Sequence, residues 1–333
     1  MKNTIKSLFS LALIICASFS TRAQSGAWQT VSNEPPCTGR DETALTALNG
    51  KLYLVGGRGI KPVEEYDPVA NAWKKLAPTP MELHHFQALA VDGRILVFGA
   101  MTGGYPKEKP VANLWWFDPK KNAWTKGAEI PEGRRRGGAG AVLCDDKLYL
   151  VCGITNGHWN GFVPWMDKLD LKTGAWTVLP DAPHARDHFN AVLVDGKIVA
   201  ADGRTSYGEK NKVFDLLVPE VDVFDLAAGH WTTLPNNLPT PRAGGMVVAR
   251  DGKVIVIGGE SMKQSAAHNE VEALTLATGQ WETLPPLNIG CHGTGAAFIG
   301  DTLYVVSGVG NRGGGPLLTA IQELRWPAAM KTK

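Results

Sequence analysis

The sequence predicts an all-β fold, a six-bladed β-propeller, and three observations point to it. Tryptophan recurs at a regular spacing, a two-strand hairpin pattern stands before most of these tryptophans, and the last repeat lacks a strand that the start of the folded chain can supply. Repeats of about 40 to 50 residues are typical of propeller blades, which have four strands each.

The chain begins with a pattern typical of an export signal. Lys2 and Lys6 give a basic start, residues 8–19 are mostly apolar, and small residues lead to Ala23, after which we expect cleavage. The apolar run is shorter than the roughly 20 residues of a membrane-spanning helix. We therefore expect a periplasmic or secreted protein without a membrane span, with a signal peptide over 1–23, a propeller over 24–327 and a C-terminal tail over 328–333.

The repeat is marked by six tryptophans: Trp28, Trp73, Trp124, Trp176, Trp231 and Trp281. Their successive spacings are 45, 51, 52, 55 and 50 residues. An aromatic residue or leucine lies seven positions before each of the last five tryptophans. Upstream of these pairs, β-rich runs are joined by short turns, four of which are Asn-Gly or Asp-Gly: Asn49-Gly50, Asp92-Gly93, Asp195-Gly196 and Asp251-Gly252. Such dipeptides favour tight hairpins, so each repeat is predicted to hold four short strands and no helix.

A glycine pair ends the second run of two repeats, as in Gly56-Gly57 and Gly258-Gly259. Together with the aromatic residue and the later tryptophan, this pattern resembles the kelch repeat over essentially the whole chain after the leader. The last repeat has a hairpin (300–308) and a third strand (321–324) but no fourth strand, and residues 28–31 are expected to supply it and to close the ring. The resemblance implies the fold but not an activity, because one scaffold hosts unrelated functions.

Long segments fall between the second and third predicted strands of five repeats: residues 101–112, 154–165, 204–219, 260–269 and 309–320. All of them lie on one face of the predicted propeller, whereas the opposite face has short turns. Long loops on a rigid scaffold commonly carry binding residues. We therefore expect the ligand site on this loop face.

Aligning the repeats brings four arginines to one position beside the central channel: Arg40, Arg136, Arg186 and Arg242. Guanidinium groups bind carboxylates, phosphates and sulfates, so this ring is predicted to line a ligand site. Arg58 and Arg204, directly after their glycine-bearing pairs, are predicted to contribute. The alternative is structural, with each arginine paired to a neighbouring acidic residue or to loop carbonyls.

The following positions carry further predicted ligand-binding residues: Asp41, His84, His85, Asp187, His188 and His292. Of these, His84, Asp187, His188 and His292 are the candidates for catalytic proton transfer, since histidine titrates near neutral pH. A metal shared by His84, His188 and His292, which belong to alternate blades, is the other possibility. Inner-strand side chains stand too far apart for the roughly 2.0 to 2.1 Å bonds of a shared ion, so we expect no metal and no cofactor.

Aromatic residues gather in the loops and strands of the second and third blades: Tyr105, Trp115, Trp116, His158, Trp159, Phe162 and Trp165. They suit either stacking on sugars or packing of the loops against one another. His158 and Trp159 are included in the predicted ligand site.

The charge balance and the cysteine content argue against nucleic acid as a partner and against a CxxC zinc site or a disulfide framework. Lys and Arg number 34 against 32 Asp and Glu, which gives no overall field to attract nucleic acid. The cysteines are too few and too scattered for a disulfide framework or a CxxC zinc site. A single disulfide between Cys37 and Cys291 is the alternative, because closure of the ring would make their blades neighbours.

The favoured function is that of an exported propeller that binds an anionic or neutral sugar, with epimerase- or mutarotase-like activity as its catalytic form. The kelch resemblance extends distantly to the sialic-acid epimerase propellers, although the acidic and arginine loop phrase of that family is not found. The alternatives are a non-catalytic protein-interaction propeller and a polysaccharide lyase with a histidine or tyrosine base. A copper-radical oxidase is disfavoured, because no adjacent Tyr-His pair and no tyrosine stands at the channel position. The ligand, the reaction and the oligomeric state stay open.

Overall fold

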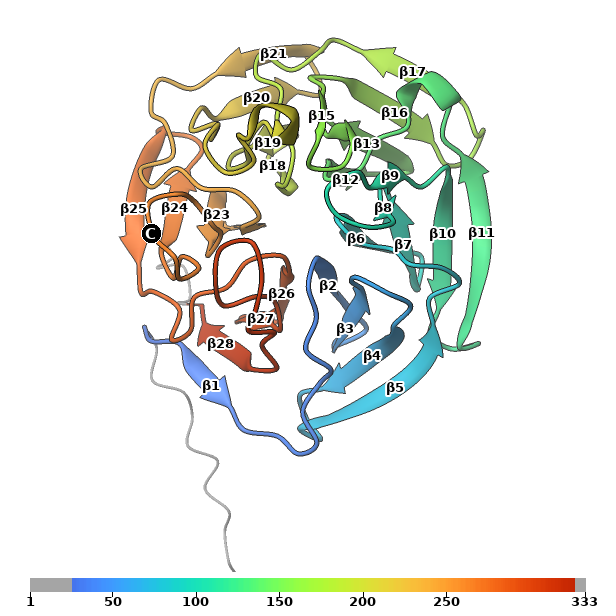
Figure 1. Ribbon diagram of the computed structural model, residues 1–333, viewed down its shortest axis with the longest axis vertical. Helices are drawn as coiled ribbons and strands as arrows, with labels where there is room; N and C mark the ends of the chain where they lie inside the picture. Colours follow the sequence, from blue (N-terminus) through green and yellow to red (C-terminus); the bar gives the residue numbers. More distant parts are fainter. Residues whose placement is uncertain (1–25, 327–333) are drawn as a thin grey trace, which may run out of the picture.

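Six four-stranded antiparallel sheets stand around a central axis in the computed structural model, which describes residues 26–326 (Figure 1). The predicted six-bladed propeller is confirmed. The predicted signal peptide and the C-terminal tail lie outside the described residues. Within the part described, no helix is long and apolar enough to span a bilayer.

The first three blades each run from the channel to the rim in chain order. Blade 1 holds β2 (Thr43–Leu48), β3 (Lys51–Gly56), β4 (Pro62–Asp67) and β5 (Ala72–Pro78). Blade 2 holds β6 (Gln87–Val91), β7 (Arg94–Phe98), β10 (Asn113–Asp118) and β11 (Ala123–Glu129), with an added hairpin of β8 (Met101–Thr102) and β9 (Lys109–Pro110). Blade 3 holds β12 (Gly140–Cys144), β13 (Lys147–Val151), β16 (Met166–Asp170) and β17 (Trp176–Leu179), with an added hairpin of β14 (Ile154–Asn156) and β15 (Asn160–Phe162).

The other three blades repeat this layout. Blade 4 holds β18 (Ala191–Val194), β19 (Lys197–Ala200), β20 (Asp222–Asp225) and β21 (His230–Thr233). Blade 5 holds β22 (Met246–Arg250), β23 (Lys253–Ile257), β24 (Val271–Thr275) and β25 (Gln280–Leu284). Blade 6 holds β26 (Gly295–Ile299), β27 (Thr302–Val306), β28 (Ile321–Arg325) and β1 (Gln29–Val31). Two short 3₁₀ turns, η1 (Glu132–Arg134) and η2 (Gly208–Lys210), lie in loops.

The ring closes as predicted, through the start of the chain. β1 pairs antiparallel with β28, Thr30 facing Gln322, and the two strands lie side by side in Figure 1. Trp28 is buried between blades 5 and 6, where its indole Nε1–H donates to the carbonyl of Pro285 at 2.9 Å. The blade that would otherwise expose an unpaired edge is thereby completed.

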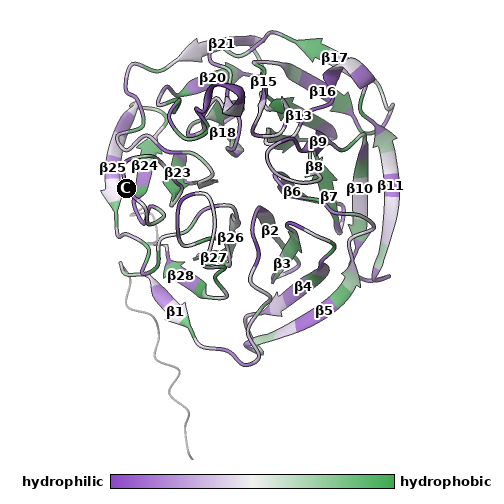
Figure 2. Cartoon of the chain, viewed as in Figure 1, coloured by the Kyte–Doolittle hydropathy of each residue, from purple (hydrophilic) through white to green (hydrophobic). Residues whose placement is uncertain are grey.

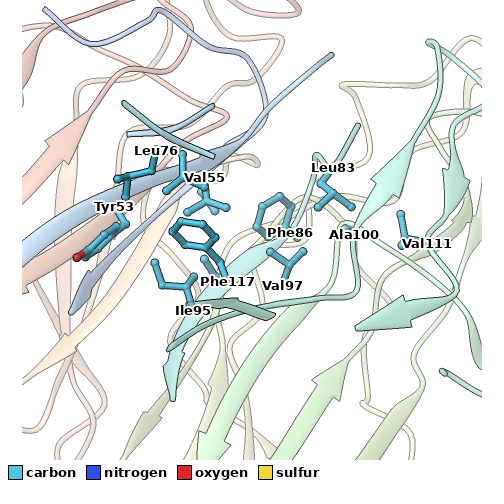
Figure 3. Close-up of a cluster of buried hydrophobic side chains, with 13 residues drawn as sticks. Tyr53, Val55, Leu76, Leu83, Phe86, Ile95, Val97, Ala100, Val111 and Phe117 are labelled. Atoms are coloured by element: carbon cyan, nitrogen blue, oxygen red, sulfur yellow. The ribbon is translucent and has the colours of Figure 1, made fainter. Parts of the chain in front are cut away.

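A hydrophobic cluster fills the space between each pair of neighbouring blades, six in all. Figure 3 shows the cluster between blades 1 and 2, where Tyr53 and Val55 of β3 meet Ile95 and Val97 of β7 and Phe117 of β10. The rim strands β5 and β11 mix hydrophilic and hydrophobic residues and have mostly exposed side chains (Figure 2). The stability of the fold therefore rests on contacts between blades.

The four aligned arginines lie inside their blades and not on a ligand surface. All four are fully buried, and each pairs with a carboxylate on the third strand of its own blade: Arg40 with Glu64, Arg136 with Asp167, Arg186 with Asp222, and Arg242 with Glu272. Arg186 also donates to the carbonyls of Asp202 and Glu220, at 3.0 and 3.1 Å. The structure thus supports the structural alternative, because each of these four guanidinium groups already has a counter-ion and carbonyl acceptors within its blade.

The possible Cys37–Cys291 bridge does not form. Both thiols are free and buried, and the Cys37 thiol instead donates to the Thr319 carbonyl at 3.4 Å. Ring closure therefore rests on β1 and on packing.

Candidate functional site

Six residues, one from each blade, form a hydrogen-bonded ring around the channel just before the innermost strands. They are Glu42, His85, Gly138, His188, Gly244 and Gly293, and all have left-handed φ between 52° and 65°. Each backbone N–H from His85 to Gly293 donates to the carbonyl of the ring residue in the preceding blade, and the N–H of Thr43 closes the circle onto Gly293.

Side chains at three of these ring positions are unexpected. Glycine adopts a left-handed φ without strain, whereas Glu42, His85 and His188 hold it at a cost of the order of 1 kcal/mol or more each. The equivalent positions of the other three blades are glycine. Strained residues of this kind gather at functional sites, so these three side chains mark the centre of the candidate site.

The two added hairpins of blades 2 and 3 bring further groups over this ring. The N–H of His158, at the tip of β14–β15, donates to the Pro106 carbonyl at 2.9 Å, and its ring Nδ1 lies 2.9 Å from Oε1 of Glu108. Gly157 permits this contact, because it has φ +55° and a Cβ there would lie 2.0 Å from Oε2 of Glu108. Glu108 also accepts a hydrogen bond from Arg58 at 2.7 Å.

A chain of polar contacts continues from His158 into blade 4. Nε2 of His158 lies 3.0 Å from Nε2 of His188, and Nδ1 of His188 is hydrogen-bonded to Asp187. Asp187 also accepts hydrogen bonds from the backbone N–H and the hydroxyl of Ser206, at 2.8 and 2.6 Å. Burial, opposed by Arg204 and Ser206, raises the pKa of Asp187.

A second buried group lies in blades 4 to 6 and adjoins the first, since the backbones of Asp187 and Arg204 are hydrogen-bonded to each other. Arg204 pairs with Glu260 at 2.5 Å, and Nε2 of His292 lies 3.4 Å from the same carboxylate. Burial alone would raise the pKa of Glu260, but Arg204 and His292 outweigh it and hold that pKa at about 2. His292 donates from Nε2 to the Asn311 carbonyl at 2.8 Å, and its buried Nδ1 has no hydrogen-bond partner.

These groups surround an open pocket on the loop face, with a volume of about 380 Å³. Its lining is Asp41, Glu42, Arg58, Tyr105, His158, Phe214, Glu260, His292 and Gly313. A neighbouring hollow of about 450 Å³ shares Tyr105 and Phe214 and adds Trp159 and Met262. Small-molecule pockets usually measure about 300 to 1,000 Å³, so this space is large enough for a small organic ligand.

The pocket is lined by three carboxylic acids, one arginine and two histidines. The acids are Asp41, Glu42 and Glu260, and the arginine is Arg58. Burial raises the pKa of Asp41 despite the nearby Arg58, and burial with Asp41 and Glu260 raises the pKa of Glu42 well above its usual range. An anionic ligand would therefore meet little positive charge here.

The structure brings together many of the predicted site residues and separates others. Asp41, Arg58, His158 and His292 line the pocket, with Trp159 in the adjoining hollow. His85 and His188 are buried and line a separate small cavity together with His158. Asp187 and Arg204 are buried too, Asp187 against His188 and Arg204 against Glu260. His84 does not line the pocket: its Nε2 lies 3.1 Å from the Gly103 carbonyl and its Nδ1 contacts Nδ1 of His85. Burial together with Arg58 lowers the pKa of His84 to about 4. Arg40, Arg136, Arg186 and Arg242 do not take part.

Five residues of the site were missed in the sequence: Glu42, Glu108, Ser206, Phe214 and Glu260. Glu42 had a signal, because it aligns with His85 and His188 next to the innermost strand. Glu260 had one too, because it directly follows Gly258-Gly259, as Arg58 and Arg204 follow their own glycine-bearing pairs. Glu108, Ser206 and Phe214 lie in loops of unequal length, where repeat alignment gives no register.

Comparison with known proteins agrees with the fold. A family model described as the KLHDC2/KLHL20/DRC7 Kelch-repeats domain matches residues 102–308, which is more than half of the chain. The Kelch-like protein terF of Aspergillus terreus is 28% identical over 334 residues, covering 91% of this chain and 68% of that protein. Kelch-like protein 35 of Mus musculus is 29% identical over 179 residues, covering 51% of this chain and 28% of that protein.

The chain spans less than half the length of several of these relatives, for example 40% of Kelch-like protein 26 of Danio rerio, which is 25% identical and matches 73% of this chain. Among solved structures, that of YjhT superposes with a TM-score of 0.72 at 17% identity, over 86% of this chain and 95% of that one. The likeness to YjhT is one of fold. The repeat pattern, the six closed blades and the family match together establish that this chain belongs to the kelch-repeat family of β-propellers.

Proposed function

We propose that the protein binds a carbohydrate in the pocket on its loop face, and that the sugar is neutral. The observation that carries the proposal is the pocket itself, which sets the aromatic rings of Tyr105 and Phe214 beside hydrogen-bonding groups such as Asp41 and His292. Aromatic faces suit the apolar faces of sugar rings, and carboxylates and imidazoles suit their hydroxyls.

The charge of the pocket favours a neutral sugar over an anionic one. The four aligned arginines, on which the prediction of an acidic sugar rested, are paired with carboxylates inside the blades. Among the residues that the structure describes, Arg58 is the one arginine that lines the pocket, and it already contacts Glu108 and Asp41. A uronate or sialate carboxylate would approach Asp41 and Glu260 without a free counter-ion.

A thermal-shift screen tests this proposal. Neutral oligosaccharides should raise the Tm of the wild type by mass action, whereas uronic, sialic and sulfated sugars should not. Asp41→Asn and Phe214→Ala should abolish the shift, while Asp195→Asn, an exposed turn residue of a blade hairpin, should keep it. Sugars that bind are then assayed by NMR for anomer exchange or cleavage, which separates a binder from a mutarotase-like enzyme or a lyase.

Two results would overturn the proposal. A shift confined to acidic sugars would contradict the argument from charge, and no shift with any sugar from a well-folded protein would contradict carbohydrate binding itself.

A protein or peptide partner is the second candidate, favoured by exposed apolar side chains on the same face. Ile60, Tyr105, Met262 and Leu317 all lie in loops that join second and third strands, and their exposed fractions are between 51% and 62%. Apolar residues gathered on one face are typical of interaction surfaces. Cross-linking of the purified protein in extracts, with Met262→Lys and Leu317→Lys as loss-of-contact variants, tests this function.

We also propose that this function is carried out after export. The support is the leader pattern with its expected cut after Ala23, which lies outside the described residues. Mass spectrometry of the protein from fractionated cells should find a chain that starts at Gln24, outside the cytoplasm. An intact chain in the cytoplasm would contradict export.

A further inference from the structure

Three imidazoles from three different segments meet beside the channel. His85 and His188 come from the hydrogen-bonded ring of blades 2 and 4, and His158 comes from the added hairpin of blade 3. One ring nitrogen of each lies within 4.8 Å of the corresponding nitrogens of the other two. The ring centroids are 4.5 Å apart for His158 and His188, 4.7 Å for His85 and His188, and 5.1 Å for His85 and His158.

Hydrogen bonds fix the tautomers of His158 and His188. The Nδ1 of His158 faces the carboxylate of Glu108, and the Nδ1 of His188 faces the carboxylate of Asp187. A carboxylate only accepts hydrogen bonds, so each Nδ1 carries the proton and each neutral ring has its lone pair on Nε2. These two Nε2 atoms lie 3.0 Å apart, so when both rings are neutral two lone pairs face each other in a buried place.

The same reasoning orients His85. His84 donates from Nε2 to the Gly103 carbonyl, which leaves the Nδ1 of a neutral His84 as an acceptor. Nδ1 of His85 faces that atom and is therefore the donor. The lone pair of His85 then lies on Nε2, which is buried, has no hydrogen-bond partner and lies 3.4 Å from Oε2 of Glu42.

We propose that His85, His158 and His188 hold a divalent transition-metal ion, with zinc as the simplest occupant. Imidazole nitrogens are preferred ligands of zinc, and bonds of about 2.0 to 2.1 Å in a tetrahedron place two nitrogens about 3.3 Å apart. The 3.0 Å between His158 and His188 is close to that separation, and His85 completes the set by a small shift. A cation at this point removes the repulsion between the facing lone pairs.

The surroundings of the three histidines fit a metal site. Carboxylates that accept the Nδ1–H of a ligating histidine fix its orientation and raise its basicity, and Glu108 and Asp187 occupy these positions. Both carboxylates are themselves held, Glu108 by Arg58 and Asp187 by Ser206. His158 also lines the open pocket, so a three-histidine site would have its fourth position toward that space.

This proposal departs from the expectation of no metal, and it does not depend on carbohydrate binding. The expectation considered inner-strand residues of alternate blades, His84, His188 and His292. His84 and His292 instead donate to loop carbonyls, and His158, from a loop that folds back over the channel, closes the distance.

Metal binding by the purified protein, prepared without a histidine tag and stripped with a chelator, tests the site. We expect the wild type to take up one equivalent of Zn²⁺, and Co²⁺ in its place to give the intense visible bands of a tetrahedral ion. His230→Ala, which removes an exposed histidine from the rim strand β21, should leave zinc affinity unchanged. Glu108→Gln should lower it by about 10- to 100-fold, the usual effect of losing an outer carboxylate, and His158→Gln by more.

X-ray absorption of the zinc-loaded wild type keeps the proposal falsifiable if a variant does not fold. Three imidazole nitrogens at about 2.0 to 2.1 Å are expected. Three results would each overturn the proposal. The folded wild type binds neither zinc nor cobalt, the absorption spectrum shows an octahedral, oxygen-rich site, or folded His158→Gln keeps the wild-type affinity for zinc.

Discussion

Each of the four aligned arginines occurs together with a carboxylate two positions before the aromatic or leucine anchor of its own blade. Glu64, Asp167, Asp222 and Glu272 hold this position in the blades with arginine. Where Leu83 or Cys291 replaces the arginine, the carboxylate is replaced as well, by Trp115 and Gln322. This pairing of positions is visible in the sequence, so the structural role of the arginines could have been predicted from the repeat alignment.

Removal of one of these arginines should destabilise the fold strongly. Arg186→Ala leaves Asp222 buried without its guanidinium partner, which we expect to lower the free energy of unfolding by about 3–5 kcal/mol. Arg250→Ala, which breaks a partly exposed pair with Asp301, should cost about 0–1 kcal/mol. Urea unfolding followed by circular dichroism measures both. Equal, small losses would mean that the buried pairs do not hold the blades.

A second residue-scale prediction concerns Asp202 and pH. Burial, only partly offset by Arg242, raises the pKa of this carboxyl to about 7, against about 3.9 in the unfolded chain. Between these values the folded protein binds a proton that the unfolded chain has lost, so this group makes the free energy of unfolding fall as pH rises from about 4 to 7, by up to about 1.4 kcal/mol per pH unit.

Unfolding should therefore be measured at a series of pH values. The free energy of unfolding should fall less steeply with rising pH in Asp202→Asn than in the wild type. Asp195→Asn, at an exposed turn, should keep the wild-type slope. The comparison is between the slopes of the free energy of unfolding against pH and not between its absolute values. The amide cannot accept hydrogen bonds from both Gly203 and Gly245 as the carboxylate does, so the substitution also changes the absolute stability. Parallel curves for all three proteins would contradict the assignment.

The blade strands could be predicted from the sequence, whereas the added hairpins could not. Asn-Gly and Asp-Gly turns adopt positive φ at both residues, for example 52° at Asn49 and 74° at Gly50, as the tight-hairpin pattern requires. The β8–β9 and β14–β15 hairpins instead lie in loops whose length differs between blades. The contact of His158 with Glu108 depends on how two such loops pack on each other, which no local pattern encodes.

The tip of the β14–β15 hairpin is the element on which the proposed metal site depends most. Gly157→Ala would place a Cβ against Glu108, in a backbone conformation that alanine rarely adopts. We expect a loss of about 1–3 kcal/mol of stability and a clear drop in zinc affinity, because His158 moves with the tip. Gly104→Ala, in the neighbouring β8–β9 loop with open space around it, should change neither. Calorimetric zinc titration and thermal unfolding check both variants, and wild-type behaviour of Gly157→Ala would contradict this role.

At the scale of the whole molecule, closure was predictable because it follows from counting strands. Five repeats supply four strands each, the sixth supplies three, and β1 adds the missing one. The six clusters between blades then form an unbroken circle of packing. Each blade is held by two neighbours, so loss of one interface weakens the ring as a whole.

Trp28 tests this circular dependence, because it packs between blades 5 and 6 beside the strand that closes the ring. Trp28→Ala should lower the free energy of unfolding by about 3–5 kcal/mol through loss of a buried aromatic side chain. The ring should still unfold in one transition, at lower denaturant, with fluorescence and circular dichroism changing together. Val178→Ala, at a 65% exposed position of the rim strand β17, should change little. An early partial transition in Trp28→Ala would show instead that the other blades stay folded once the closing blade is released, and that the circle is not one cooperative unit.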